Sequence, residues 1–265
     1  MPKKGLPIYN IEDFKSDVDF YCNSLRVHLK EHHFINTPHK HDFYMVVLFT
    51  HGSGTHEIDF TNYKVAPGTI FMLSPGQTHN WKLSKDIDGY IFFHSKSFYD
   101  SISISQKIKD YPFFNSIHNQ PILKLKSRPE EKIRSLFLEI KKEYEEEGLL
   151  KFQKLHTLST LVYIELTRSY KLREKINSPS YLSKIKELED LVDKHFRTLK
   201  YPYQYADMMA ISEKHLNRIC RSCLNKTTTD LIGDRIILEA KRSLTHTQLS
   251  INQIAESLGY EDASY

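Results

Sequence analysis

Basic side chains gather on one short segment in the last third of the chain. Residues 212–226 contain four basic residues and one acidic residue, whereas residues 181–265 as a whole contain 12 of each. The segment therefore forms a local positive patch in a neutral region. Arginine and asparagine side chains can pair with guanine and adenine edges, and lysine neutralises phosphates. This composition indicates double-stranded DNA as a partner, although a solvated basic helix face would look similar.

A second set of polar residues in the N-terminal half could bind a metal ion or a small molecule. In "PHKHDFY" and "PGQTHNW", His39, His41 and His79 have a spacing that resembles a cupin site, and three histidines can hold a transition metal. The following "FYMVVLF" has no carboxylate, however, so we expect no metal. His41, Tyr44, His79 and Trp81 are candidate contacts to a small molecule in an apolar cavity. Alternatively, these side chains form the core of a small barrel.

The cysteines suggest packing rather than chemistry. The chain has three, too few for a disulfide framework at a length of 265 residues. Cys220 and Cys223 have the spacing of half a zinc site, but no second pair of ligands follows. Both share one helical face with Leu216 and Ile219, so we expect them to be small core residues.

The elements that would position these residues change in character along the chain. Residues 35–94 contain short apolar and β-branched runs separated by Gly and Pro, which predicts a small β-sandwich or barrel. Two amphipathic helices should follow. Ser127 and Glu130 form a capping-box signature at the start of the first, and the second should span Leu149 to Tyr170.

The C-terminal region contains one pattern twice. In "YQYADMMAISEKHLNRICRSCLNK", a short helix, a tight turn and a second helix make a helix-turn-helix pattern. "SINQIAESLGYEDASY" repeats it, with Ala255 in the place of Ala206 and Gly259 in the place of Ala210. The repeat predicts two helix-turn-helix units joined by a long helix.

The segment "RIILEAKRSLTHTQLSINQIAESLGYEDASY" resembles the DNA-binding domain of the AraC/XylS family of bacterial transcription regulators. The resemblance covers about the last 80 residues, and the β-rich front resembles the effector-binding and dimerisation half of that family. The matching positions are Arg235, Ala240, Leu244, Ser250, Ile251, Ile254, Ala255, Gly259, Tyr260, Asp262, Ser264 and Tyr265, with Ala206, Ile211, Ser212, Leu216 and Arg218 in the first unit.

The resemblance also implies roles for the basic segment. Lys214, Asn217 and Arg218 fall where the family contacts bases, although Lys214 could equally contact a phosphate. Arg221 and Lys226 would contact phosphates.

In the family, the second unit continues with a recognition helix beyond the position of Tyr265. We therefore expect a chain truncated in its second helix-turn-helix, with Ser264 as the first exposed residue of the second reading helix. The expected class is α+β: an N-terminal cupin-like β-barrel with two following helices, then an all-α double helix-turn-helix domain that is incomplete. The expected regions are an effector-binding domain (1–126), a helical dimerisation segment (127–172), a linker (173–182) and a DNA-binding domain (183–265).

These features predict a sequence-specific, effector-responsive transcription regulator. They do not distinguish activation from repression, and we expect an activator. Its expected partners are double-stranded DNA, an unknown small-molecule effector, a second copy of the chain and RNA polymerase. We expect neither a cofactor nor enzymatic activity. No apolar run approaches the roughly 18 residues of a membrane helix, so we expect a cytoplasmic protein. The alternatives are a cupin-type metal-binding enzyme with a helical appendage, and a protein whose helices bind other proteins.

Overall fold

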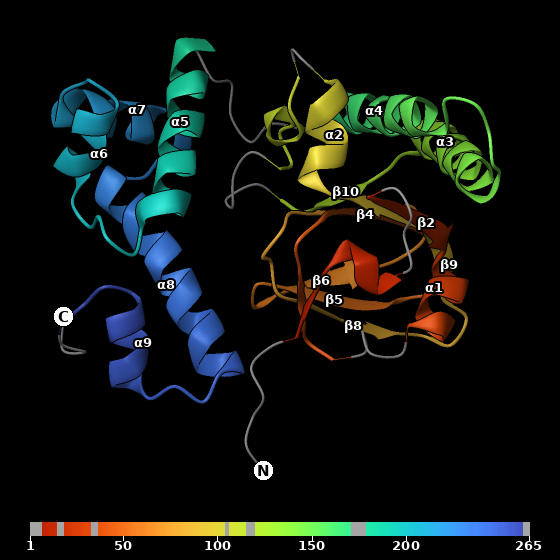
Figure 1. The fold of residues 1–265 in the computed structure, drawn as a ribbon, viewed down its shortest axis with the longest axis horizontal. Coiled ribbons are helices and arrows are strands. Elements are labelled where there is room, and N and C mark those ends of the chain that lie inside the picture. Colours follow the sequence, from red (N-terminus) through yellow and green to blue (C-terminus); the bar gives the residue numbers. More distant parts are fainter. Residues whose placement is uncertain are drawn as a thin grey trace. The chain divides into compact units, whose positions relative to one another are not determined.

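The computed structural model describes residues 7–14, 19–32, 37–103, 106–114, 120–170 and 179–261. These residues divide into two compact units, a β-rich unit up to residue 170 and a helical unit from residue 179 (Figure 1). The mixed α/β class, with an N-terminal sheet domain and a C-terminal helical domain, is therefore confirmed. No helix in the described residues is long and apolar enough to cross a membrane.

The β-rich unit contains two antiparallel sheets and a short parallel pair. The larger sheet has the order β10-β7-β4-β9-β2, the smaller has the order β6-β5-β8, and β1 pairs with β3. The strands are β1 (Ile8–Tyr9), β2 (Phe20–Ser24), β3 (Lys40–His41), β4 (Tyr44–His51), β5 (Gly54–Ile58), β6 (Thr61–Val65), β7 (Thr69–Leu73), β8 (His79–Leu83), β9 (Asp88–His94) and β10 (Ile122–Lys124).

Strand β4 is apolar almost throughout because both of its faces are buried. Met45 and Val47 belong to the inner core, the cluster between the two sheets that also contains Phe71 and Phe93. Val46 alternates onto the other face and belongs to the outer core, which lies between the larger sheet and the helices. One strand thus forms a wall shared by two cores.

The helices of this unit are α1 (Leu25–Glu31), α2 (Lys96–Ile102), α3 (Ser127–Glu145) and α4 (Lys151–Ser169), with 3-10 turns at Ile11–Phe14 and Ile108–Asp110. Helices α3 and α4 lie side by side over one face of the larger sheet (Figure 1). Their buried stripes, which include Ile133, Phe137 and Val162, complete the outer core. The prediction of Ser127 as the N-cap was wrong by one residue, because Lys126 has the extended backbone of the cap and makes no side-chain capping bond.

The helical unit consists of α5 (Pro179–His195), α6 (Pro202–Met208), α7 (Glu213–Leu224), α8 (Thr228–His246) and α9 (Ile251–Ser257). A single core connects all five helices and contains Leu188, Ala206, Leu216, Leu231 and Ile254. Helices α6 and α7 form the predicted helix-turn-helix, with the small side chain of Ala206 buried in this core.

The turns after α6 and α9 have the same hydrogen-bond pattern. Ile211 N donates to Ala206 O at 3.0 Å, and Tyr260 N donates to Ala255 O at 2.9 Å. The residues before these donors also share the left-handed conformation, with φ of 51° at Ala210 and 82° at Gly259. The internal repeat predicted for the sequence is thus present up to the second turn. The segment after that turn, residues 262–265 with Ser264, lies outside the described residues.

These matched turns differ in how much room they leave for a side chain. A Cβ atom at Gly259 would lie 1.8 Å from the carbonyl oxygen of Arg197, whereas Ala210 is exposed. Gly259→Ala should therefore lower the free energy of unfolding of the helical unit by about 2–4 kcal/mol, through backbone clash and positive φ. Ala210→Gly should be neutral or stabilise it by up to about 1 kcal/mol. Urea unfolding followed by circular dichroism at 222 nm compares the two, and equal effects would contradict the assigned close approach.

Candidate DNA-binding helix and ligand site

Helix α7 presents its basic side chains on one face because its other face is core. Ser212 caps the helix, since its hydroxyl accepts a hydrogen bond from His215 N at 3.2 Å. Lys214, Arg218 and Arg221 are exposed and follow each other at helical spacing. The buried stripe is Leu216, Ile219, Cys220 and Cys223, as its spacing predicted.

The three exposed cations form no ion pairs within the part of the chain that the structure describes. The Arg218 guanidinium donates to Nδ1 of His215 at 2.6 Å, which orients it along the helix without neutralising it. Carboxylates pair with other cations of this unit, such as Asp193 with Arg235 at 2.8 Å. The charge of Lys214, Arg218 and Arg221 is therefore available to an anionic partner.

Asn217, a predicted base contact, faces the N-terminus of the next helix instead of standing fully in solvent. Its side-chain oxygen accepts a hydrogen bond from the backbone N–H of Thr228 at 3.1 Å. The Thr228 hydroxyl in turn donates to the Cys220 sulfur at 3.4 Å. The bond from Thr228 N–H to Asn217 satisfies one of the otherwise unpaired N–H groups at the start of α8 and holds α7 against α8.

Lys226 lies just after α7 and carries a compensated charge. Its ammonium group pairs with the Asp234 carboxylate at 2.6 Å. The basic face of α7 thus has fewer basic residues without an ion pair than the sequence suggested. Its unpaired part consists of Lys214, Arg218 and Arg221.

Four histidines of the β-rich unit meet in one buried cluster, the histidine cluster, formed by His39, His41, His56 and His79. The His79 ring centroid lies 4.3 Å from that of His39, 5.1 Å from His41 and 5.2 Å from His56. Trp81 borders the cluster, 5.2 Å from both His56 and His79. The structure therefore brings together three of the four predicted ligand contacts.

Sequence reasoning missed His56, although a signal was present. Strand β5 pairs with β8 so that His56 lies opposite Trp81 and Ile58 opposite His79. The alternation in "THEIDF" places His56 and Ile58 on the same face, and Ile58 is an obvious core residue.

Tyr44, the fourth predicted ligand contact, lies elsewhere. It is buried in the outer core, where its ring meets Phe114 edge to face with a centroid distance of 5.0 Å. Its neighbours Phe43 and Met45 point into the inner core instead. Because successive side chains of a strand alternate, Tyr44 faces the helices and not the histidine cluster.

Hydrogen bonds assign the tautomers of His39 and His41, and burial keeps the histidine cluster uncharged. The Nδ1–H groups of His39 and His41 donate to the carbonyl oxygens of Thr37 and Phe43, both at 2.8 Å. His56 Nε2 and His79 Nδ1 share a hydrogen bond of 3.1 Å. Burial lowers the pKa of His41 to about 3 and holds the pKa values of His56 and His79 well below the ordinary value. The cluster is therefore uncharged at neutral pH.

Among the described residues, no group of three or more His, Cys, Asp or Glu side chains is placed to hold a metal ion. This finding includes the triad of His39, His41 and His79 on which the alternative of a cupin-type enzyme depends. The cluster can instead offer neutral hydrogen-bond donors and acceptors beside aromatic rings.

Residues 7–14 cover one end of this region. Strand β1 pairs with β3, and the Tyr9 ring packs edge to face on His39 with a centroid distance of 5.2 Å. Phe14 is buried in the inner core against Phe43 and Phe93. The N-terminal segment thus contacts both the histidine cluster and the inner core.

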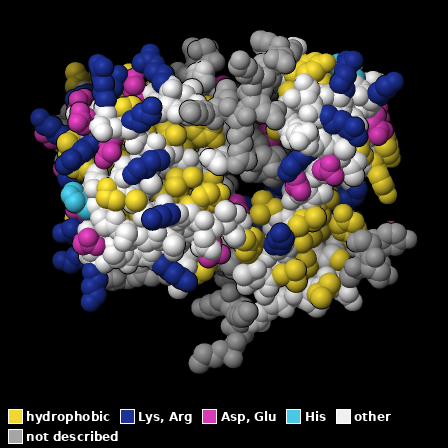
Figure 2. Space-filling view, turned by 180° about the vertical axis from the view of Figure 1, so that it is seen from behind, with side chains coloured by type: hydrophobic (Ala, Val, Ile, Leu, Met, Phe, Trp, Pro, Cys, Tyr) yellow, Lys and Arg dark blue, Asp and Glu magenta, His cyan; other side chains and the backbone are white. Residues whose placement is uncertain are grey.

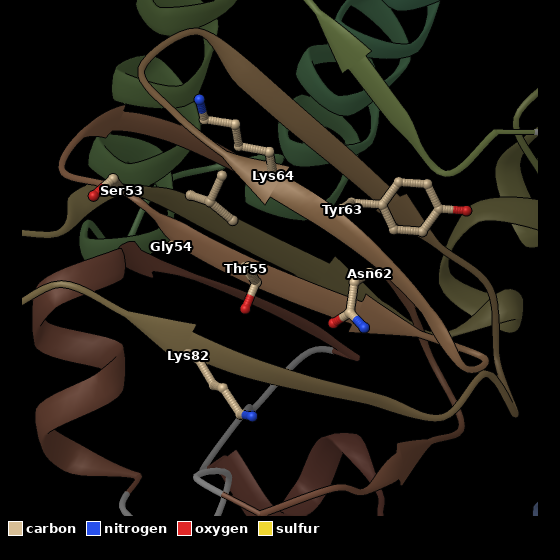
Figure 3. A pocket seen from close by; sticks show the side chains of 8 residues that line it. Ser53, Gly54, Thr55, Asn62, Tyr63, Lys64 and Lys82 are labelled. Atoms are coloured by element: carbon tan, nitrogen blue, oxygen red, sulfur yellow. The ribbon is translucent and has the colours of Figure 1, made fainter.

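An open hollow of about 580 Å³ lies over the smaller sheet (Figure 3). Lys64 and Lys82 flank Thr55 there, on the two strands that pair with β5. These three side chains alternate with the inward-facing His56 and Trp81, so they belong to the opposite face of the sheet. The hollow is therefore separate from the histidine cluster.

Hydrophobic side chains gather on the α8–α9 end of the helical unit (Figure 2). The exposed large apolar residues of this end are Ile237, Leu244, Leu249 and Ile251. An apolar surface of this kind is typical of an interaction site.

Comparisons with known proteins find matches to both units. A family model described as an AraC-like ligand binding domain matches residues 23–155, and one described as a helix-turn-helix domain matches residues 205–265. The chain is 22% identical over 232 residues to the HTH-type transcriptional activator RhaR of Enterobacter sp. (strain 638), covering 86% of this chain and 80% of RhaR.

It is also 24% identical over 256 residues to the uncharacterized HTH-type transcriptional regulator YfiF of Bacillus subtilis (strain 168), covering 93% of this chain and 78% of that protein. Among solved structures, unsaturated fatty acid-bound ToxT of Vibrio cholerae strain SCE256 aligns with a TM-score of 0.45 and 13% identity. That alignment covers 94% of this chain and 90% of the ToxT chain.

Proposed function

Because this chain belongs to the AraC family of transcription regulators, we propose that it binds specific DNA sequences through α7 under the control of a small molecule in the β-rich unit. The observation that carries this proposal is the unpaired basic face of α7. Lys214, Arg218 and Arg221 lie opposite a buried stripe on the second helix of a helix-turn-helix, which is the helix that enters the major groove in this motif.

The contacts divide by side-chain chemistry. Arg218 reads a guanine edge, and Lys214 reaches either a base edge or a phosphate. Arg221, one turn further along the helix, neutralises a phosphate. Asn217 positions α7 against α8 through its bond to Thr228, and its amide nitrogen remains for a DNA contact. Lys226 contacts DNA only when its pairing with Asp234 is exchanged for a phosphate.

The second helix-turn-helix reads the adjacent major-groove segment. Its first helix is α9, and its turn has the hydrogen-bond pattern of the first turn. Ser264 would be the first exposed residue of its reading helix. The long helix α8 joins the two units and spaces the two readers.

The chain acts as a homodimer through its helical segment at residues 127–172. Helix α4 supports this proposal because Leu161 and Ile164 are exposed on it beside the buried stripe. These residues are three apart and therefore share one helix face. The linker at 173–182 joins the effector-binding and dimerisation regions to the DNA-binding domain at 183–265.

The chain works as an activator, in keeping with the name of its relative RhaR. As part of the same proposal, it contacts RNA polymerase. Binding to chromosomal DNA places it in the bacterial cytoplasm. We assign it no catalytic activity and no cofactor. The arrangement of the described histidines, cysteines and carboxylates gives no support to the alternative of a cupin-type metalloenzyme.

Selection of bound duplexes from a random DNA pool tests the proposal. We expect an enriched motif and a steep fall in affinity with salt. Arg221, together with Lys214 where it takes a phosphate, would contribute a slope of about −1 to −2 per chain in log K against log salt concentration. If no motif is enriched and affinity does not depend on salt, sequence-specific binding by this chain is excluded.

A further inference from the structure

Helix α9, the first helix of the second helix-turn-helix, has two connections to the rest of the helical unit. The first is α8, against which α9 packs and from which it follows after residues 247–250. The second is the loop between α5 and α6, residues 196–201, which contacts the turn at the end of α9. Because this loop leads directly into α6, it joins the first helix-turn-helix to the second without passing through α8.

The backbone of this loop lies directly against the backbone of the second turn. A Cβ atom at Gly259 would lie 1.8 Å from the carbonyl oxygen of Arg197, so only a residue without a side chain leaves room for that oxygen. The Arg197 guanidinium in turn pairs with the Glu239 carboxylate of α8 at 3.4 Å. The loop therefore contacts both α8 and the second turn.

The ammonium group of Lys200 makes the polar part of this contact. It donates hydrogen bonds to the backbone carbonyls of Phe196, in its own loop, and of Leu258, at the end of α9. The last carbonyls of a helix have no partner within the helix, so Lys200 supplies one. The same ammonium lies 4.8 Å from the centroid of the Tyr260 ring, within the range of a cation–π contact. These contacts of Lys200 with Leu258 and Tyr260 form a clamp, the Lys200 clamp.

The first turn shows that a turn of this type forms without a clamp. Its backbone hydrogen bonds have the same pattern, and Met209 takes the place of Leu258. Among the residues with a described placement, no side chain donates to the Met209 carbonyl. Ala210, the counterpart of Gly259, is exposed. The Lys200 clamp is therefore not needed to make the turn, which indicates a role in placing it.

A helix attached through one short loop can change its angle at that loop, whereas a second attachment restricts it. We infer that Lys200 is a positioning residue of the DNA-binding domain, which fixes the second helix-turn-helix relative to the first and so sets the spacing of the two DNA segments that they read. This inference rests on the proposed function in that the second unit is taken to read DNA. Lys200 acts through the turn and not by contacting DNA, because its ammonium group is bonded within the protein.

Hydrogen exchange of the full chain, measured by mass spectrometry, tests the clamp without DNA. Lys200→Met keeps the aliphatic stem but removes the ammonium donors. We expect exchange in peptides that cover Gly259 and Tyr260 to accelerate about tenfold or more, because hydrogen bonds from charged groups are among the strongest. Peptides that cover the first turn should keep the wild-type rate. Lys194→Met, at an exposed lysine of α5, should leave exchange unchanged throughout.

Two further variants separate the clamp from general stability. Lys200→Arg keeps a charged donor and should slow exchange at the second turn relative to Lys200→Met. Tyr260→Leu removes the ring but leaves the bond to the Leu258 carbonyl, so it should accelerate exchange less than Lys200→Met. Circular dichroism of each variant verifies that the helical unit is folded.

Selection of bound duplexes gives the functional readout. With Lys200→Met, we expect the segment read by α7 to be kept, whereas the adjacent segment should lose its fixed spacing from it. A variant that only destabilised the helical unit would weaken the preference at both segments alike. Lys194→Met should select the same motif as the wild-type chain.

The outcomes distinguish the positioning role from the function on which it rests. If Lys200→Met exchanges at the second turn like the wild type, or selects both segments at the wild-type spacing, the positioning role is overturned. Equal acceleration in both turns also overturns it, because Lys200 would then stabilise the whole unit. If the wild-type chain selects only one segment, the proposed second reader is wrong, and hydrogen exchange still decides whether Lys200 holds the turn.

Discussion

Replacing Lys214, Arg218 and Arg221 together with alanine is expected to lower the affinity for the selected DNA motif about 1,000-fold, or about 4 kcal/mol. All three side chains are exposed and free of ion pairs in the described residues, so their charge is available to DNA. Without these side chains, fewer counterions are released from the DNA phosphates on binding. Fluorescence anisotropy with labelled duplex at several salt concentrations should show both the loss of affinity and a shallower salt slope.

Single substitutions distinguish a side chain that contacts a base from side chains that contact a phosphate or hold α7 in place. Arg218→Ala should relax the preference at one base pair, whereas Arg221→Ala should weaken all sequences alike. Asn217→Ala should lower the unfolding free energy by about 1 kcal/mol, because Thr228 N–H loses its acceptor. Lys194→Ala, at an exposed lysine of α5, is the matched control. If the control weakens binding as much as Arg218→Ala, α7 is not the reading helix.

Acid should unfold the β-rich unit before the helical unit. Burial lowers the pKa of His28 and His41 to about 3 and that of His94 to about 4. In the unfolded chain these histidines take up a proton near pH 6.5, whereas in the folded unit they do not. The free energy of unfolding is therefore highest above pH 6.5 and falls as the pH is lowered. Three such histidines lower the free energy of unfolding by about 4 kcal/mol per pH unit between about pH 6 and pH 5.

Trp81 makes this prediction measurable, because the only tryptophan of the chain lies in the β-rich unit. Urea unfolding at a series of pH values, followed by its fluorescence, gives the slope of stability against pH. In the helical unit, His195 and His215 are not buried. The free energy of unfolding of that unit should therefore show no comparable slope against pH. His41→Gln should reduce the slope by about 1.4 kcal/mol per pH unit, and His51→Gln should leave it unchanged. Equal slopes for both variants would contradict the assigned burial.

Local patterns in the sequence predicted the parts of the fold that depend on a single periodicity. The stripe of Leu216, Ile219, Cys220 and Cys223 required only helical spacing and proved to be core. The correspondence between Ala210 and Gly259 required only alignment of the chain with itself, and both residues have positive φ.

Features that depend on tertiary partners escaped prediction. Strand β4 is buried on both faces, so its uniform apolar character gave no sign that Tyr44 turns away from His41. Asn217 read as a DNA contact because its partner, the N–H of Thr228, becomes adjacent only when α7 packs against α8. His56 joins the cluster through the pairing of β5 with β8, which no single segment encodes.

Because β4 belongs to both the inner and the outer core, the two cores of this unit cannot change independently in evolution. Val46 and Val47 are neighbours in sequence, yet one supports the helices and the other faces the space between the sheets. A mutation that changes the shape of one core moves β4 and so changes the packing of the other core. Selection for a new small molecule would therefore act at the same time on the helices α3 and α4, so we expect compensating substitutions on both sides of β4 in relatives with different ligands.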